Sequence, residues 1–136
     1  MNTVKAFVEI GNDNTYSVYV DLADNTLNYG IHGTGNTVEE AIADFISSYE
    51  GMKNLYAKKG IKFVEAQFTY QYDMASFLQY YTKFFSLAGL SRLTKVNKGQ
   101  LSHYVTGRKR PRGRTVERIS KSVHSFGKTL CQVNFV

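Results

Sequence analysis

The spacing of apolar residues changes near Asp73, and this change constrains the fold more than any other feature of the sequence. Upstream of it, most segments alternate apolar and polar residues as β-strands do, and one longer segment repeats at helical spacing. Downstream, apolar residues recur every three or four positions nearly to the end. We therefore expect an α+β protein with an α+β domain at residues 1–72 and an all-α domain at residues 73–136.

The first domain is predicted to have the order βββαβ. Strands are expected at 3–10, 15–21 and 26–32, followed by a "GTGN" loop, a helix that starts behind Thr37 and a fourth strand within 61–72. Thr37 and Glu40 can form a capping box at the start of the helix, and Gly60 can end it. The apolar face of the last strand is most simply core; alternatively, some of its tyrosines face a partner chain.

The second domain is predicted to contain four to five helices. They are expected within 74–85, 89–96, 97–107 and 114–130, with Asn97 as an N-cap and Gly107 as a stop. The last helix repeats its apolar residues at alternating spacings of three and four, at Val116, Ile119, Val123, Phe126 and Leu130. Residues 131–136 are apolar enough for a strand or a docked tail, and the pattern does not decide between the two.

Charge is divided unevenly along the chain. Residues 1–86 hold six Lys and Arg against ten Asp and Glu, whereas residues 87–136 hold eleven Lys and Arg against Glu117 alone. Such asymmetry indicates a half that binds a polyanion, joined to a half with another partner. A solvated basic tail is the alternative, which the apolar periodicity of the same residues disfavours.

Residues 89–107 have the pattern of a DNA-binding helix-turn-helix. Leu93, Val96, Leu101 and Val105 would pack the two helices together, which leaves polar residues to face the major groove. The predicted base-reading residues are Lys98, Gly99, Gln100 and His103, since Gln can pair with adenine and Lys with guanine, while Gly99 permits close approach. The predicted contacts to the DNA backbone are Arg92, Lys95, Asn97, Ser102, Arg108, Lys109, Arg110, Arg112 and Arg114.

Residues 75–130 resemble a Cro/repressor-type helix-turn-helix domain. The resemblance lies in "VNKGQLSHYVTGRKRP", with "LS", an aromatic residue, Gly, basic residues and Pro in the order of that family. The chain has Lys95 where that family often has Gly in the turn between the helices.

The upstream half resembles the HicB-like antitoxins, which have a truncated RNase H-like fold. It has three expected strands and then the "GxTxEEA" pattern at Gly35, Thr37, Glu39, Glu40 and Ala41, and it keeps Asp21 and Leu22 of a "PDLPG" stretch. The resemblance implies a transcriptional repressor whose acidic N-terminal domain binds a small basic HicA-like RNA-cleaving toxin and whose C-terminal domain binds operator DNA. The alternative is a stand-alone regulator whose N-terminal domain serves dimerisation or another protein partner.

Other functions find little support in the sequence. Glu9, Asp21, Asp24 and Asp44 have no spacing that indicates metal-dependent catalysis, and His32, His103 and His124 have no metal-ligand spacing with Cys131. We therefore expect no enzyme, metal or cofactor. The basic stretch "GRKRPRGR" has no aromatic residues to stack on RNA bases, so duplex DNA is the expected ligand. One cysteine and no signal or spanning segment predict a cytoplasmic protein, and reading two half-sites predicts a homodimer or higher homo-oligomer.

Overall fold

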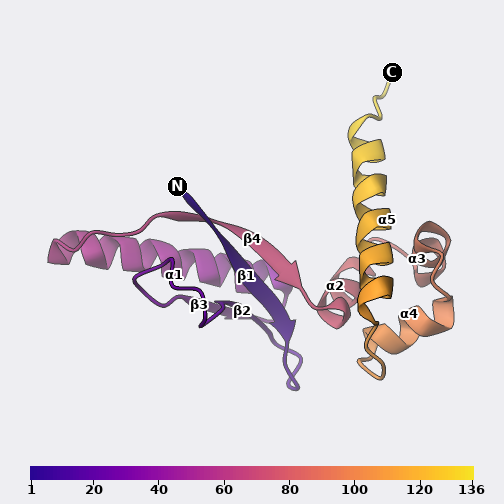
Figure 1. Cartoon of the computed structure of the whole chain (residues 1–136), viewed down its shortest axis with the longest axis horizontal. Coiled ribbons are helices and arrows are strands. Elements are labelled where there is room, and N and C mark those ends of the chain that lie inside the picture. The colour runs from indigo at the N-terminus through magenta and orange to yellow at the C-terminus, as the bar shows by residue number, and fades with distance from the viewer. The chain divides into compact units, whose positions relative to one another are not determined.

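The computed structural model describes all 136 residues and divides into two compact units, Met1–Ser76 and Phe77–Val136. The chain is α+β, as predicted, with a βββαβ sheet unit followed by a region of four helices (Figure 1). The elements in order are β1 (Asn2–Ile10), β2 (Tyr16–Val20), β3 (His32–Gly35), α1 (Val38–Lys59), β4 (Ala66–Tyr72), α2 (Met74–Tyr81), α3 (Leu87–Thr94), α4 (Lys98–Val105) and α5 (Gly113–Cys131).

The four strands form one mixed sheet in the order β3-β2-β1-β4. β1 to β3 are an antiparallel meander, whereas β4 runs parallel to β1 with Asn2 opposite Ala66 and Val8 opposite Tyr72. A parallel neighbour requires a crossover connection, and α1 provides it while covering one face of the sheet (Figure 1). Val4, Ala6 and Val8 alternate along β1 and are buried on that face.

The third strand lies at His32–Gly35, so the strand predicted at 26–32 and the predicted loop at "GTGN" were both wrong. Gly33 and Gly35 lie directly against the backbone of α1: a Cβ on Gly33 would stand 2.3 Å from the Ala41 carbonyl oxygen, and one on Gly35 would stand 2.6 Å from the Ala41 nitrogen. The Thr34 N–H also donates to Asp44 Oδ2 on α1 at 2.9 Å. Gly33 and Gly35 thus allow β3 to lie close against α1, and they do not form a loop.

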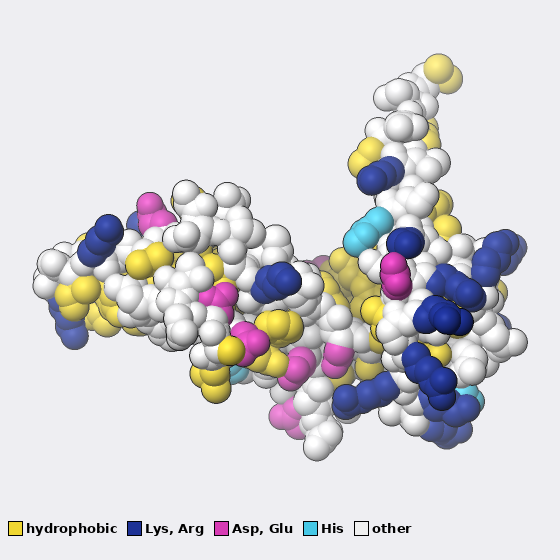
Figure 2. All heavy atoms as spheres, in the orientation of Figure 1, with side chains coloured by type: hydrophobic (Ala, Val, Ile, Leu, Met, Phe, Trp, Pro, Cys, Tyr) yellow, Lys and Arg dark blue, Asp and Glu magenta, His cyan; other side chains and the backbone are white.

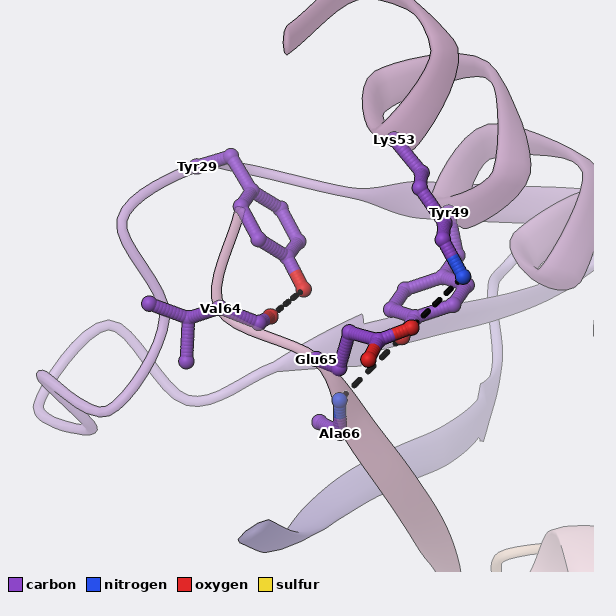
Figure 3. A network of polar contacts seen from close by, with 6 residues as sticks. All are labelled: Tyr29, Tyr49, Lys53, Val64, Glu65 and Ala66. Atoms are coloured by element: carbon purple, nitrogen blue, oxygen red, sulfur yellow. Dashed lines mark hydrogen bonds and ion pairs between the residues drawn. The ribbon is translucent and has the colours of Figure 1, made fainter. Parts of the chain in front are cut away.

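The segment expected to be the third strand instead anchors the chain that enters β4. Tyr29 stacks on Phe63 with 4.4 Å between ring centroids, and its hydroxyl donates to the Val64 carbonyl at 2.7 Å (Figure 3). Beside it, the Ala66 N–H donates to Tyr49 Oη at 3.1 Å, and Lys53 Nζ forms an ion pair with Glu65 at 2.6 Å (Figure 3). Side-chain contacts therefore hold residues 61–65, which are not part of any strand.

The ends of α1 follow their local signals. Thr37 is the N-cap, its hydroxyl accepts from the Glu40 N–H at 3.1 Å, and Gly60 ends the helix with a left-handed φ of 68°. The reciprocal capping-box bond was predicted incorrectly, because Glu40 Oε2 accepts from the N–H of Asn36, at 2.8 Å, instead of from Thr37. The apolar side of β4 is half-buried, and Phe68 and Tyr70 pack edge-on against Phe45 of α1.

The helical unit has a small core and ends in an extended tail. Leu78, Leu90, Leu101 and Ile119 supply one buried side chain from each of its four helices. Residues after α5 form neither a strand nor a docked tail, because they lack regular structure and are exposed. None of the chain's helices combines the length and the apolar character that crossing a membrane requires.

Candidate nucleic-acid interface

Two short helices, α3 and α4, pack together around a few buried residues. Ser86 caps α3 by accepting from the Gly89 N–H at 3.0 Å, which fixes where the helix begins. Leu90 of α3 and Leu101 and Tyr104 of α4 are buried. Leu93 and Val105, predicted as packing residues with Val96 and Leu101, are only half-buried, whereas Val96 and Leu101 are buried. The polar side of α4 is thereby turned toward solvent.

The turn between α3 and α4 is tight and consists of Lys95, Val96 and Asn97. Lys95 takes the left-handed conformation, with φ 62° and ψ 22°, so it adopts the geometry that glycine favours without being glycine. The buried hydroxyl of Thr94 donates to the Leu90 carbonyl at 2.7 Å and accepts from the Val96 N–H at 3.3 Å. Thr94 was not predicted as part of the turn, although a Thr at the end of a helix commonly bonds to the carbonyl four residues earlier.

Asn97 begins α4 as predicted. Its Oδ1 accepts from the Gly99 N–H at 2.7 Å, and the side chains of Lys98 and Gln100 on the first turn are exposed. Ser102 is also exposed, while His103 is half-buried and so presents less of its ring than the other predicted base-reading residues. The other end of α4 is held by Gln79 of α2, whose Nε2 donates to the Val105 carbonyl at 2.8 Å. This contact has no signal in the sequence.

The basic loop folds back on the end of α4. Gly107 ends the helix with φ 75°, and its N–H donates to the Tyr104 carbonyl at 3.1 Å. The Lys109 N–H donates to the His103 carbonyl at 3.3 Å, and the Arg108 N–H to Thr106 Oγ1 at 3.4 Å. These hydrogen bonds fix the backbone of the first loop residues and thereby the positions from which the Arg108 and Lys109 side chains extend.

The cations of the loop and the two adjoining helices have no acidic partners. Those predicted to contact the DNA backbone are all exposed, and none forms an ion pair: Arg92, Lys95, Arg108, Lys109, Arg110, Arg112 and Arg114. The only ion pair in the helical unit joins Lys121 to Glu117 within α5, at 3.1 Å. Figure 2 shows Lys and Arg gathered over this unit on the face in view.

The start of α5 adds unpaired backbone donors beside the same loop. Its N-cap is Arg112, which makes no side-chain capping bond, and its first turn has no acidic residue. The first N–H groups of a helix carry partial positive charge and bind phosphate groups readily. Arg112 and Arg114 flank this end. The loop and the start of α5 thus offer phosphate both side-chain and backbone donors.

The carboxylates and histidines that could indicate catalysis or metal binding do not gather. No group of three or more His, Cys, Asp or Glu lies close enough together to hold a metal ion. Asp44 accepts from Thr34, Asp21 from the Ala23 N–H and Asp24 from the Thr26 N–H, so each supports local backbone. Glu9 accepts from the Tyr19 hydroxyl at 2.6 Å, which raises the pKa of Tyr19 to about 12.

Comparison of the chain with protein-family models, with curated proteins and with solved structures finds no match.

Proposed function

We propose that the protein is a sequence-specific DNA-binding transcriptional repressor that binds duplex DNA through α4 and the basic loop. The observation that carries the proposal is the combination of two features at one place. A short helix is held by a buried face, with Lys98 and Gln100 exposed at its start, and a loop of unpaired cations follows directly. A recognition helix in the major groove uses its N-terminal outward residues in this way.

The two features would have different tasks. Gln100 and Lys98 can pair with base edges and so select a sequence, with Gly99 allowing close approach. Arg108, Arg110 and the neighbouring cations would contact phosphates, which contribute affinity but little sequence information. His103 is half-buried and would contribute less to base reading than Gln100.

Selection from a library of random-sequence duplexes with the full chain tests this proposal. We expect an enriched sequence that the protein binds more tightly than a shuffled duplex of the same composition. Gln100→Ala should reduce that preference by about tenfold or more, because a bidentate contact to a base contributes about 1–3 kcal/mol of discrimination.

The matched control is Gln132→Ala, which removes the same exposed side chain beyond the end of α5. It should leave both affinities unchanged. If Gln100→Ala weakens binding to the selected and the shuffled duplex equally, Gln100 does not read bases. If no sequence is enriched and no duplex binds, the proposal is wrong.

A second candidate function, compatible with the first, is toxin binding by the sheet unit, as in a HicB-like antitoxin. The observation that favours it is the edge position of β4, whose residues Ala66–Tyr72 carry no charge and no proline. An uncharged edge strand can pair with a strand of another protein. Co-expression with a small basic ribonuclease encoded beside this chain tests it: a stable complex and inhibited RNA cleavage are expected, and a ribonuclease left fully active would refute it.

A further inference from the structure

Helix α5 carries an apolar stripe that its own unit covers only in part. The stripe consists of Val116, Ile119, Val123, Phe126 and Leu130, and Val133 continues the same spacing beyond the helix. Ile119 is buried, and the Phe126 ring packs edge-on against Phe85 at 6.0 Å. Farther along, Leu130 is 51% exposed and Val133 48% exposed. The C-terminal half of α5 extends beyond the other helices of its unit (Figure 1).

An open apolar groove lies at the base of the uncovered stripe. It has a volume of about 460 Å³ and is lined by Phe126 of α5 and by Leu90 and Leu93 of α3, with Arg92 as its one charged residue. Phe84 contributes a ring that is 64% exposed at the same groove. Because Phe126 belongs to both features, the apolar residues of the groove are continuous with the outer stripe.

Every charged side chain of α5 lies away from this stripe. At 100° per residue, the positions beside the stripe are occupied by Thr115, Ser120, Ser122, Gly127 and Thr129, all small and uncharged. The charged residues fall on the remaining surface of the helix: Arg114, Glu117, Arg118, Lys121 and Lys128. Two flanking hydroxyls already donate to backbone carbonyls of the helix, Ser122 to Arg118 at 2.9 Å and Thr129 to Ser125 at 3.1 Å. Burying these two hydroxyls would therefore leave neither donor unsatisfied.

We propose that this surface is a homodimer interface, in which α5 packs against α5 of a second copy of the chain. The helical unit holds twelve Lys and Arg against one Glu, so two copies repel each other wherever those charges face. The stripe with its flanks is a helix face that carries no charge. Spacings of three and four match the 3.5-residue repeat with which two helices pack along a shared seam.

The small residues that flank the stripe also favour a second copy of α5 as the partner of this face. Ser, Gly and Thr beside the seam let a second helix of the same kind approach closely, and a two-fold axis brings the same residues together from both copies. DNA does not fit the α5 stripe and its flanks, because these residues offer no cation to phosphate, and Arg92 is the one cation that lines the groove at their base. This inference rests on the geometry of α5 and does not depend on DNA binding, although a dimer would supply two copies of α4.

The mass of the full chain in solution, measured by light scattering over a dilution series, tests the proposal. We expect twice the single-chain mass of 15.4 kDa for the wild type. Leu130→Asp should raise the dissociation constant of the dimer on the order of a hundredfold, since each interface contains the substitution twice and each places a charge in an apolar contact. Because Leu130 is exposed within one chain, the helical circular-dichroism signal should not change.

Ser125→Asp is the matched control, because it places the same carboxylate on the exposed, opposite side of the same helix. It should leave the dimer intact. A monomeric wild type overturns the proposal. So does a Leu130→Asp variant that dimerises as well as the wild type, which would place the contact on another surface, such as the β4 edge. Equal loss in Leu130→Asp and Ser125→Asp would also overturn it, because the effect would then be one of charge and not of this face.

Discussion

The two units use their charged side chains in opposite ways. The sheet unit holds five Lys against ten Asp and Glu, and most of its carboxylates form bonds within the unit. Asp13, Asp21, Asp24 and Asp73 hold turns or a helix start, Glu40 accepts from the Asn36 N–H before α1, and Asp44 joins α1 to Thr34 of β3. Glu9 and Glu65 bond to Tyr19 and Lys53. In the helical unit, by contrast, only one of twelve Lys and Arg forms an ion pair. Charged groups without a partner inside the protein, here the cations of the helical unit, are therefore the better candidates for binding a ligand.

This contrast separates stability from binding. Most carboxylates of the sheet unit accept hydrogen bonds from its own backbone, so they are explained by the fold. The cations of the helical unit have no such explanation, because unpaired like charges destabilise a compact domain. We therefore expect substitutions in the sheet unit to change its stability and substitutions of the cations to change affinity for DNA.

The largest expected effect is on the fold of the sheet unit alone. In Gly33→Val, the added side chain would meet the α1 backbone, where even a Cβ stands 2.3 Å from the Ala41 carbonyl oxygen. We expect a loss of about 3 kcal/mol or more of unfolding free energy. Hydrogen exchange should show lost protection within residues 2–72 and unchanged protection in α3 to α5.

Gly30→Val is the control for this substitution, because a Cβ on Gly30 has nothing within 4 Å. It should have little effect. Loss of protection throughout both units in Gly33→Val would show that they do not fold independently, and the comparison between them would fail.

The second prediction concerns the unpaired cations. Replacing both Arg108 and Arg110 by Ala should weaken binding to any duplex about tenfold or more. It should also reduce the slope of log affinity against log salt concentration by about 2, because each phosphate that is no longer neutralised removes close to one from that slope. Titrations at several salt concentrations measure both. The paired replacement of Lys58 and Lys59, at the end of α1, should change neither. An unchanged salt slope in the Arg108 and Arg110 variant would contradict the assignment of the loop.

The third prediction concerns the tyrosine that anchors the chain entering β4. Tyr29→Phe removes the hydrogen bond to the Val64 carbonyl and should cost about 1 kcal/mol of unfolding free energy in the sheet unit. Tyr70→Phe removes a half-buried hydroxyl from β4 and should cost less. Denaturant titrations compare the two, and equal losses would mean that the Tyr29 bond contributes nothing of its own.

Tyr29 also predicts how stability depends on pH. Burial raises the pKa of Tyr29 above its ordinary value of 10.0, so the unfolded chain releases this proton first. The resulting stabilisation is present below pH 10 and is lost as the pH rises above it. Tyr29→Phe should therefore lose less stability than the wild type between about pH 10 and 12. Identical losses would contradict the burial of this hydroxyl.

The smallest expected effect separates the two roles of Lys95. Lys95→Gly should stabilise the helical unit by about 0.5 kcal/mol, because glycine adopts a left-handed conformation more easily, and should weaken DNA binding modestly. Lys95→Ala removes the same charge and should weaken DNA binding equally without that stabilisation. Thermal unfolding and salt titrations measure the two effects. Full DNA affinity in both variants would remove Lys95 from the predicted phosphate contacts.

The features that depend only on residues a few positions apart in the sequence were predicted best. Thr37 and Gly60 mark the ends of α1, and Asn97 and Gly107 mark the ends of α4. These ends could be predicted because caps and left-handed glycines act within a few sequence positions. β3 was misplaced because Gly33 and Gly35 disfavour a strand locally and are explained only by the helix that lies against them. Gln79 was missed for the same reason, since its bond to the Val105 carbonyl joins two helices that are 26 residues apart in the sequence. Thr94 was missed although its bonds to Leu90 and Val96 are local.

DNA binding by α4 and the basic loop can be located residue by residue from backbone amide shifts, recorded by NMR on the full chain as the selected duplex is added. We expect the largest changes within residues 97–114, from the start of α4 through the basic loop to the start of α5, and little change in residues 2–72. Large changes confined to the sheet unit, with residues 97–114 unaffected, would show that the DNA-binding surface lies elsewhere.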